Sequence, residues 1–402
     1  MTGSTTLAQD KLDVREKSRS NLFNWRGQFT PQFVDYILNN FAEPDNTVID
    51  PFSGSGTVLQ ECSTKLMSCY GYEINPAAYA MSKFFTLANM PFSERQSLLS
   101  SLEEKLVRIA AEFGDIPLLQ DRIEFRDRHK NLIDFSKEFF SLATNKRERI
   151  LAINLLFIAE DRARADLYST ILYAFQYLRK SALSLPYTEK VISAQLTDAR
   201  MVHEHCHARA DVLFTSPPYI NVFNYHQNHR AILEAIGWNI LKVAQSEIGS
   251  NRKNRGNRFR TVIQYCLDME QALRSFWHAL GPDGIIILVV GRESNVRKTP
   301  FYNGAIIREI MTRLAAFDEV TNHERKFTNR FGLDIKEDII IARKTGSQPS
   351  ESHAREVALK HLESALPGTA GDIRADIKDA IKSIDEIEQS PLFTMKEIFS
   401  NA

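Results

Sequence analysis

Short apolar runs that end at glycine, proline or a carboxylate recur along the chain and predict buried strands. These runs lie at residues 48–49, 69–72, 191–196, 211–214 and 285–290. Between them, apolar residues recur every three or four positions, which indicates amphipathic helices. Strands that alternate with helices in this way are typical of an α/β fold with a parallel sheet. We expect residues 317–321 and 337–342 to add two hairpin-like strands at the end of the sheet.

The distribution of helical patterns divides the chain into segments. Long helical patterns at 91–190 predict an insertion between the second and third strands. The flanking residues, 23–90 and 191–345, are expected to form one α/β domain. Residues 1–22 are polar and charged and are expected to be a flexible arm, whereas 346–402 are expected to be a helical tail. The insertion has no catalytic spacing, so it either contributes to recognition or only supports the sheet.

A glycine-rich turn, DPFSGSGT at residues 50–57, follows the first strand. Gly54 and Gly56 allow the main chain to approach a ligand closely, and a tight turn of an ordinary α/β protein is the alternative interpretation. The second strand ends in Glu73, where nucleotide-binding sheets place an acid on the ribose hydroxyls. The turn is no GxGxxG fingerprint, and Asp50 at its mouth would repel a pyrophosphate. This favours a nucleoside without phosphates, of which S-adenosylmethionine, with its cationic sulfonium and ammonium, is the usual example.

A second motif, TSPPY at residues 215–219, follows the strand at 211–214. Its two prolines fix the backbone and leave carbonyl groups without nearby amide donors. With DPFSGSGT, and with Glu73 followed by Asn75 and Pro76, this motif resembles the amino-methylating DNA methyltransferases over about residues 24–90 and 190–345. In that family the TSPPY variant is most often associated with the 4-amino group of cytosine.

The resemblance implies a Rossmann-like methyltransferase sheet, S-adenosylmethionine as cofactor and a set of site residues. The expected cofactor-binding residues are Phe29, Thr30, Asp50, Pro51, Phe52, Gly54, Ser55, Gly56, Thr57, Glu73, Ile74, Asp198 and Thr215. In the family, the segment with Phe29 closes over the methionine end of the cofactor, and an acid at the position of Asp198 lies near the adenine amino group. Phe29 is explained equally well as a core residue.

The expected catalytic residues are those of the second motif: Ser216, Pro217, Pro218 and Tyr219. An exocyclic amine is a poor nucleophile, so acceptors that hold it in line would promote transfer. The Ser216 side chain and the Pro217 carbonyl are expected to supply those acceptors. Tyr219 is expected to stack on a base that has been flipped out of the duplex. Tyr225 could line the same target pocket.

A basic stretch at residues 251–260 stands out in a chain whose 50 cationic and 50 anionic side chains cancel. Because the net field is close to zero, contacts with double-stranded DNA must come from local patches. The stretch contains five cations and no acid: Arg252, Lys253, Arg255, Arg258 and Arg260. We expect a phosphate-contacting loop in which Phe259 is available for stacking, and a solvated loop is the alternative.

Several further possibilities are weighed on the sequence. The cluster at residues 203–207 has no second ligand pair with zinc spacing, so we expect no metal. The apolar runs are too short to cross a bilayer, and no secretory pattern or cysteine framework occurs, which favours the cytoplasm. Alternatives to a cytosine-N4 enzyme are an adenine-N6 DNA enzyme, an RNA guanine-N2 enzyme or a non-catalytic binding subunit. A separately acting restriction endonuclease is a conceivable partner, and the oligomeric state is open.

Overall fold

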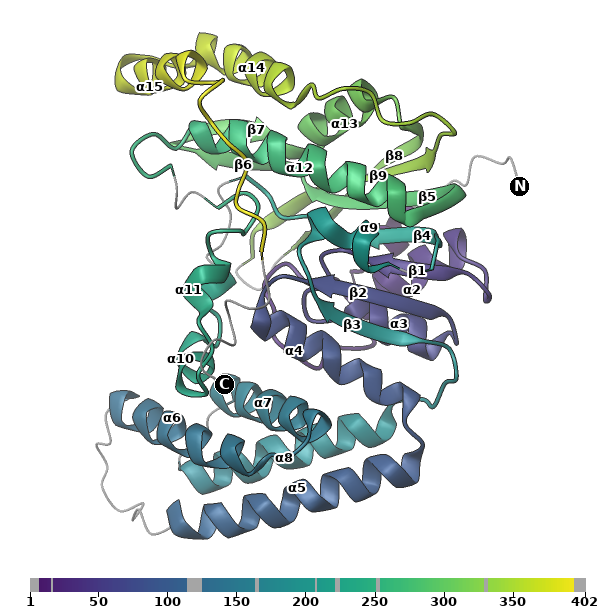
Figure 1. The fold of residues 1–402 in the computed structure, drawn as a ribbon, viewed down its shortest axis with the longest axis vertical. Helices are drawn as coiled ribbons and strands as arrows, with labels where there is room; N and C mark the ends of the chain where they lie inside the picture. The colour runs from purple at the N-terminus through teal and green to yellow at the C-terminus, as the bar shows by residue number, and fades with distance from the viewer. Residues whose placement is uncertain are drawn as a thin grey trace.

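The computed structural model describes residues 7–15, 17–113, 125–162, 166–206, 208–220, 225–250, 254–328 and 332–393. Figure 1 shows a central sheet, a stack of helices at one end of the molecule and a pair of helices at the other. None of the helices within these ranges combines the length and the apolar character that a bilayer crossing needs.

The sheet has seven strands in the order β3-β2-β1-β4-β5-β9-β8. Five strands are parallel: β1 (Thr47–Asp50), β2 (Ser68–Glu73), β3 (Ile192–Leu196), β4 (Ala210–Thr215) and β5 (Leu280–Gly291). The strand β9 (Asp334–Lys344) runs antiparallel to β5, and the edge strand β8 (Phe317–Thr328) runs antiparallel to β9 and therefore in the direction of β5. The strand order reverses beside β1, which creates a crevice at the carboxyl ends of β1 and β4. The expected Rossmann-like sheet is therefore confirmed.

Alternating residues of the strands enter two separate cores. Val48 of β1 packs in one core with α2 (Pro31–Phe41) and α3 (Thr57–Thr64). Ile49 packs in the other with α12 (Arg260–Ala279). Both faces of the sheet are thus covered. This explains why the sequences of the strands are nearly continuous apolar runs.

The remaining elements of the α/β part follow from the chain order. The helices are α4 (Pro76–Phe84), α9 (Val202–His205), α10 (Arg230–Ala235), α11 (Ile240–Val243) and α13 (Asn303–Leu314), with 3₁₀ turns η1 (Phe85–Asn89), η2 (Ala199–Met201) and η3 (Tyr225–Gln227). A small hairpin that the sequence pattern did not predict is formed by β6 (Glu293–Val296) and β7 (Thr299–Tyr302). Pro31 begins α2, and the side chain of Thr30 before it makes no capping hydrogen bond.

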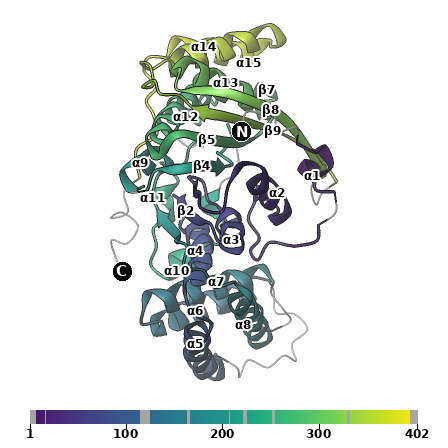
Figure 2. The same cartoon turned by 90° about the vertical axis from the view of Figure 1, so that its right-hand side faces the viewer.

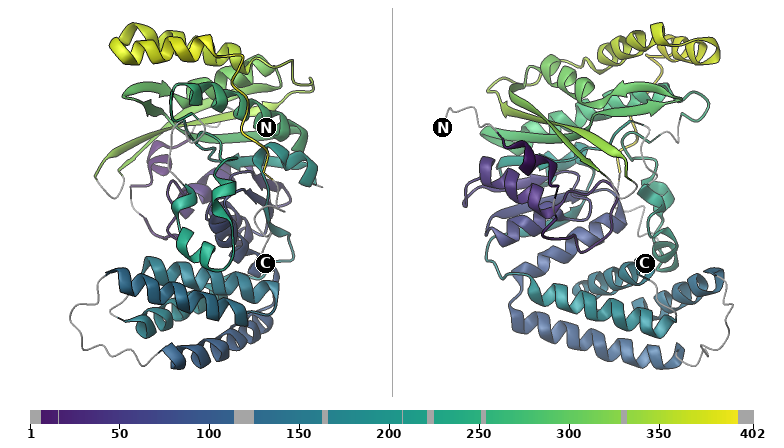
Figure 3. Two further views of the ribbon diagram at one scale, coloured as in Figure 1. Left: turned by 60° about the vertical axis from the view of Figure 1, so that its left-hand side comes forward. Right: turned by 180° about the vertical axis from the view of Figure 1, so that it is seen from behind.

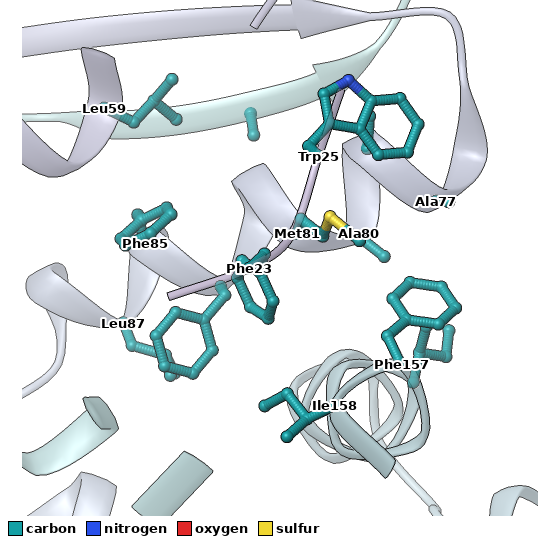
Figure 4. Close-up of a cluster of buried hydrophobic side chains, with 14 of the residues drawn as sticks. Phe23, Trp25, Leu59, Ala77, Ala80, Met81, Phe85, Leu87, Phe157 and Ile158 are labelled. Carbon is teal, nitrogen blue, oxygen red and sulfur yellow. The ribbon is translucent and has the colours of Figure 1, made fainter. Parts of the chain in front are cut away.

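The helices that follow α4 and precede β3 in the described chain form the stack at one end of the molecule (Figures 1 and 2). They are α5 (Phe92–Phe113), α6 (Phe125–Leu142), α7 (Lys146–Asp161) and α8 (Leu167–Ser184). One contact that joins the stack to the sheet domain is the hydrogen bond from the Asn154 side chain of α7 to the Ala80 carbonyl of α4, at 2.8 Å. Phe157 of α7 belongs to the same buried apolar cluster as Met81 of α4 and Phe23 from the segment before α2, and Figure 4 labels all three.

The segment before residue 23 differs from the flexible arm that its composition suggested. Helix α1 (Gln9–Asp13) packs on α2 and beside β8, where Figure 2 places it. Leu12 is fully buried, and Asp13 accepts a hydrogen bond from the Lys326 amide. Two apolar side chains and a few backbone contacts are enough to fix residues that look polar overall, so the prediction of a flexible arm is wrong for residues 7–15.

The C-terminal region forms the helix pair at the far end of the molecule (Figure 3). Helices α14 (Ala354–Ala365) and α15 (Gly371–Lys382), joined by η4 (Leu366–Gly368), pack beyond α12. The chain then returns towards the sheet. There the Ser390 amide and hydroxyl both donate to Asp268, a fully buried residue of α12.

Candidate functional site

A cavity opens at the carboxyl ends of β1, β2 and β4, the crevice that the strand order creates. It encloses about 1030 Å³, including space open to solvent. Most of the residues predicted for the site line its wall: Phe29, Asp50, Pro51, Phe52, Gly54, Ser55, Thr57, Glu73, Ile74, Asp198, Ser216, Pro217, Pro218, Tyr219 and Tyr225. Thr30, Gly56 and Thr215 lie beside these residues in the chain without lining the wall.

The glycine turn is built around Glu73. The Gly54 amide donates to Glu73 Oε2 and the Asn75 amide to Glu73 Oε1, both at 2.8 Å. Gly56 has φ +87°, and a Cβ there would lie 2.7 Å from Ser82 Cα of α4. Only glycine at position 56 therefore allows the turn to pack on α4 while the Gly54 amide donates to Glu73. The result is a carboxylate held rigidly at the end of β2.

Asp50 and Thr215 connect the ends of β1 and β4. The Thr215 hydroxyl donates to Asp50 Oδ1 at 2.6 Å, and the Phe52 amide lies within hydrogen-bonding distance of both side chains. Thr215 thus holds two residues of the cavity wall, Asp50 and Phe52, although it does not line the cavity itself. The cofactor turn and the TSPPY segment are fixed to each other by this contact.

Burial dominates the electrostatics of the two acids. It raises the pKa of Asp50 to about 7, against the opposing effect of the hydrogen bond from Thr215. Burial likewise raises the pKa of Glu73 to about 7, against three backbone amides that favour its ionised form. Both carboxyls therefore change their ionisation near neutral pH, where a cationic ligand would favour the charged form.

The TSPPY segment bends over the end of β5. Ser216 and Tyr219 are partly exposed to the cavity, whereas Pro217 is buried. The Tyr219 ring lies on Gly291, where a Cβ would come within 2.5 Å of it, and its hydroxyl donates to Glu337 at 3.3 Å. Burial and the charge of Glu337 raise the Tyr219 pKa well above its ordinary value. The Tyr219 ring is therefore fixed against Gly291 at the edge of the cavity.

An aromatic wall comes from the segment before α2. Trp25 stacks on Tyr225 with ring centroids 5.8 Å apart, and Phe29 stacks on Phe214 at 5.2 Å. Phe29 is both buried and part of the cavity wall, so its two interpretations from the sequence do not exclude each other. The Ser55 hydroxyl donates to Gln28 at 2.6 Å and ties this segment to the glycine turn.

Asp198 differs from its expected role as a free acceptor. Arg200, which is fully buried, donates three hydrogen bonds to it, and the Phe393 amide donates a fourth. Both carboxylate oxygens thus have two donors each. Asp198 shapes the wall, and it could accept a hydrogen bond from an adenine amino group only by giving up one of these contacts.

The basic stretch is only partly described, because Arg252 and Lys253 lie outside the described residues. Arg255 and Arg258 are exposed, whereas Arg260 forms an ion pair with Asp379 of α15 at 3.1 Å. The expectation that Phe259 is available for stacking is wrong. Its side chain is fully buried and packs against Phe301, because the residue lies directly before α12 and faces the core.

The histidine-rich cluster at residues 203–207 is described by the structure except for His207, and its first histidine packs against α12. His203 Nδ1 lies 2.9 Å from the Ser275 hydroxyl, and the His203 ring lies 5.6 Å from that of His278. Within the described ranges, no three histidine, cysteine or acidic side chains are grouped so as to hold a metal ion. His207 lies outside those ranges.

Ser53 and Glu247 are among the wall residues that had not been predicted. Both are buried, and Ser53 Oγ and Glu247 Oε1 have no hydrogen-bond partner among the described residues. Ser53 belongs to the DPFSGSGT motif, so the motif itself could have indicated it. Glu247 lies in a loop after α11, and no sequence signal pointed to it.

Two comparisons of the sequence with known proteins find matches. A family model described as DNA methylase, N6_N4_Mtase, matches residues 8–84. The Type II methyltransferase M.MjaII of Methanocaldococcus jannaschii is 24% identical over 143 residues, which are 35% of this chain and 26% of that protein. The matched part therefore spans about a quarter of the length of this relative.

Similar solved structures are more distant. TrmN from Thermus thermophilus is 14% identical with a TM-score of 0.32, covering 80% of this chain and 50% of its own. A SAM-dependent methyltransferase from Methanosarcina mazei is 10% identical with a TM-score of 0.35, covering 77% and 96%. The rRNA methyltransferase aviRa from Streptomyces viridochromogenes is 13% identical with a TM-score of 0.32, covering 90% and 98%.

The cavity also fits S-adenosylmethionine, the cofactor that the family match supports. Among the described residues its wall carries four carboxylates and one arginine, Arg26, which suits the sulfonium and ammonium of this molecule. The unpartnered oxygens of Ser53 and Glu247 offer acceptors for its hydroxyl or amino groups. Together, the family match and the curated relative support the amino-methyltransferase family for this chain.

Proposed function

We propose that the protein is a DNA methyltransferase that transfers a methyl group from S-adenosylmethionine to an exocyclic amino group, with cytosine N4 as the target. The observation that carries this proposal is the hydrogen bond between Thr215 and Asp50. It joins the catalytic segment to the cofactor turn, so that Ser216 and Pro217 line the same cavity as Glu73. Groups that bind the methyl donor and groups that hold an amine thus share one enclosed site.

The chemistry follows from the target amine. Its lone pair is delocalised into the base, so the protein must hold it in line with the methyl group. The Ser216 hydroxyl and the Pro217 carbonyl can accept its two N–H groups and favour the pyramidal form that attacks. The bound cofactor supplies the activated methyl group on its sulfonium. The sequence contains no Pro-Cys pair, which a covalent route to carbon methylation would use.

Access to the base determines how DNA must bind. A base that is stacked within a duplex cannot reach a cavity at the carboxyl ends of the β-strands. The target base must therefore be flipped out of the duplex and into the cavity. Tyr219, which lines the cavity, can stack on the flipped base. The exposed Arg255 and Arg258 can neutralise phosphates of the bound DNA. The choice of cytosine over adenine rests on the TSPPY variant alone, and adenine N6 is the alternative that the same geometry would serve.

Transfer of a radiolabelled methyl group to duplex DNA tests the catalytic assignment. Wild type should label DNA, whereas Ser216→Ala should lower turnover at least tenfold, because removal of one transition-state acceptor costs about 2–4 kcal/mol. Calorimetry should show S-adenosylmethionine binding to both proteins with similar affinity. A matched control is Ser250→Ala, outside the cavity wall. Full activity of Ser216→Ala would refute the role of this hydroxyl.

A further inference from the structure

Glu247 is a buried carboxylate of the cavity wall to which neither a motif nor the proposed mechanism assigns a role. Its side chain is 8% exposed. Oε2 lies 3.1 Å from Nδ1 of the buried His226, which fixes the orientation of the carboxylate. Oε1 has no hydrogen-bond partner among the described residues. A buried acceptor that has lost its water and has no donor destabilises the protein. We therefore expect a bound ligand to supply a donor to this oxygen.

Glu247 and Glu73 line the same cavity and are close enough for their charges to interact. The negative charge of Glu247 contributes to the raised pKa values of Glu73 and Tyr225. Glu73 is fixed by the amides of Gly54 and Asn75, at the strand end where such folds bind ribose hydroxyls. Two oriented carboxylates near each other repel in the free protein and suit a ligand that brings two neighbouring donors. The two vicinal hydroxyl groups of a ribose are such donors.

A metal ion is a weaker explanation for the same pair of acids. Within the described residues, no three acidic, histidine or cysteine side chains come close enough to form a metal site. Asp198 also lines the cavity, but its oxygens are engaged by Arg200 and the Phe393 amide. A neutral diol needs acceptors but no closed shell of ligands, so it matches this arrangement better.

We propose that Glu247 is a second ribose-binding carboxylate, which accepts a hydrogen bond from one hydroxyl of the nucleoside while Glu73 accepts one from the other. His226 is the positioning residue that holds Glu247 towards the cavity. The inference rests on the proposed function, because it takes S-adenosylmethionine as the ligand. It goes beyond that function by assigning the ribose contact to a loop outside the family's motifs.

The test is calorimetric binding of S-adenosylhomocysteine and of its 2′-deoxy and 3′-deoxy analogues. Wild type should bind the parent compound and should lose about tenfold in affinity when the hydroxyl that faces Glu247 is absent. Glu247→Gln should bind the parent about tenfold more weakly, and the penalty for removing that same hydroxyl should fall below about threefold. The exposed Glu204→Gln is the matched control and should behave like wild type.

The outcomes separate this inference from the function on which it rests. If wild type binds the parent compound but Glu247→Gln keeps the full penalty for both deoxy analogues, Glu247 does not contact the ribose. Unchanged binding together with weaker DNA methylation would assign Glu247 to the target base and would also overturn the inference. If wild type binds no S-adenosylhomocysteine, the proposed function itself fails. Should Glu247→Gln not fold, His226→Gln provides the same comparison, with a smaller expected loss of discrimination.

Discussion

The Thr215 hydroxyl donates a hydrogen bond of 2.6 Å to Asp50 Oδ1 across the ends of β1 and β4. Both residues are buried. Each residue belongs to one of the two motifs that lie far apart in the sequence. The contact therefore turns two separate sequence signals into one site, and it can be tested directly.

Replacing Thr215 with Val removes the donor but keeps the shape of the side chain. Asp50 then keeps the hydrogen bond from the Phe52 amide but loses the shorter one from Thr215 in a buried position, and unfolding should require about 1–3 kcal/mol less free energy. Urea denaturation at pH 8 measures this loss. Thr215→Ser keeps the hydroxyl and should lose much less. Equal stability of Thr215→Val and wild type would show that the contact does not hold the two strand ends together.

The raised pKa of Asp50 predicts how stability depends on pH. Because its pKa is about 7 when folded and near 3.8 when unfolded, the free protein should lose stability as the pH rises from about 4 through 7. The near-isosteric Asp50→Asn cannot ionise. It should therefore be more stable than wild type at pH 8, by roughly 2–4 kcal/mol, and similar to it at pH 4. Urea denaturation at both pH values measures the difference, and a pH-independent gap would contradict the assignment.

The same variant should separate folding from cofactor binding. Ionised Asp50 and Glu73 favour a cationic ligand, so wild type should bind S-adenosylmethionine more tightly as the pH rises through 7. Asp50→Asn should lose binding although it folds more stably. Calorimetric titrations at pH 6 and pH 8 measure both effects. Wild-type affinity that falls over this interval would be inconsistent with charged acids at the ligand.

The exposed cations before α12 should contribute a salt-dependent part of DNA affinity. Arg255→Gln with Arg258→Gln should weaken binding of duplex DNA and should reduce the slope of log K against log salt by about two. Fluorescence anisotropy at several salt concentrations measures this. The control pair, Lys137→Gln with Lys180→Gln, removes two exposed charges from α6 and α8. An equal effect of the control pair would move the DNA contact to the helical stack.

Arg200 should support both the fold and the cavity. It is fully buried, pairs with Asp198 and Asp268, and also donates to the carbonyls of Ser390 and Pro391. Arg200→Met would leave two buried acids without a cation, which should cost about 3–5 kcal/mol of unfolding free energy. The exposed Arg374→Met of α15 is the control. Urea denaturation that fails to distinguish the two variants would rule out this role.

The sequence predicted most of the architecture and much of the wall of the cavity, for a physical reason. In a parallel sheet, residues that directly follow strands converge at one edge, so the positions of Asp50, Glu73 and Ser216 along the chain were enough to group them. The strand runs were apolar because both faces of the sheet are covered, which made them easy to recognise.

The rest depends on contacts that no local pattern contains. Glu247 lies in an irregular loop, and its position in the cavity wall and its contact with His226 depend on how that loop packs. Asp198 is occupied by a neighbour, Arg200, and by a backbone amide 195 residues later in the chain. Phe259 stands among cations in the sequence, yet α12 turns it into the core. Sequence order says little about such pairings, because they are decided by the packing of distant segments.

The most direct measurement of the central claim is mass spectrometry of nucleosides from duplex DNA incubated with the protein and S-adenosylmethionine, with transfer RNA as a parallel substrate. We predict N4-methylcytosine in the DNA and no modification of the RNA. N6-methyladenine would keep the mechanism and correct the target base. Modification of RNA alone, or of neither substrate, would contradict the assignment as a DNA methyltransferase.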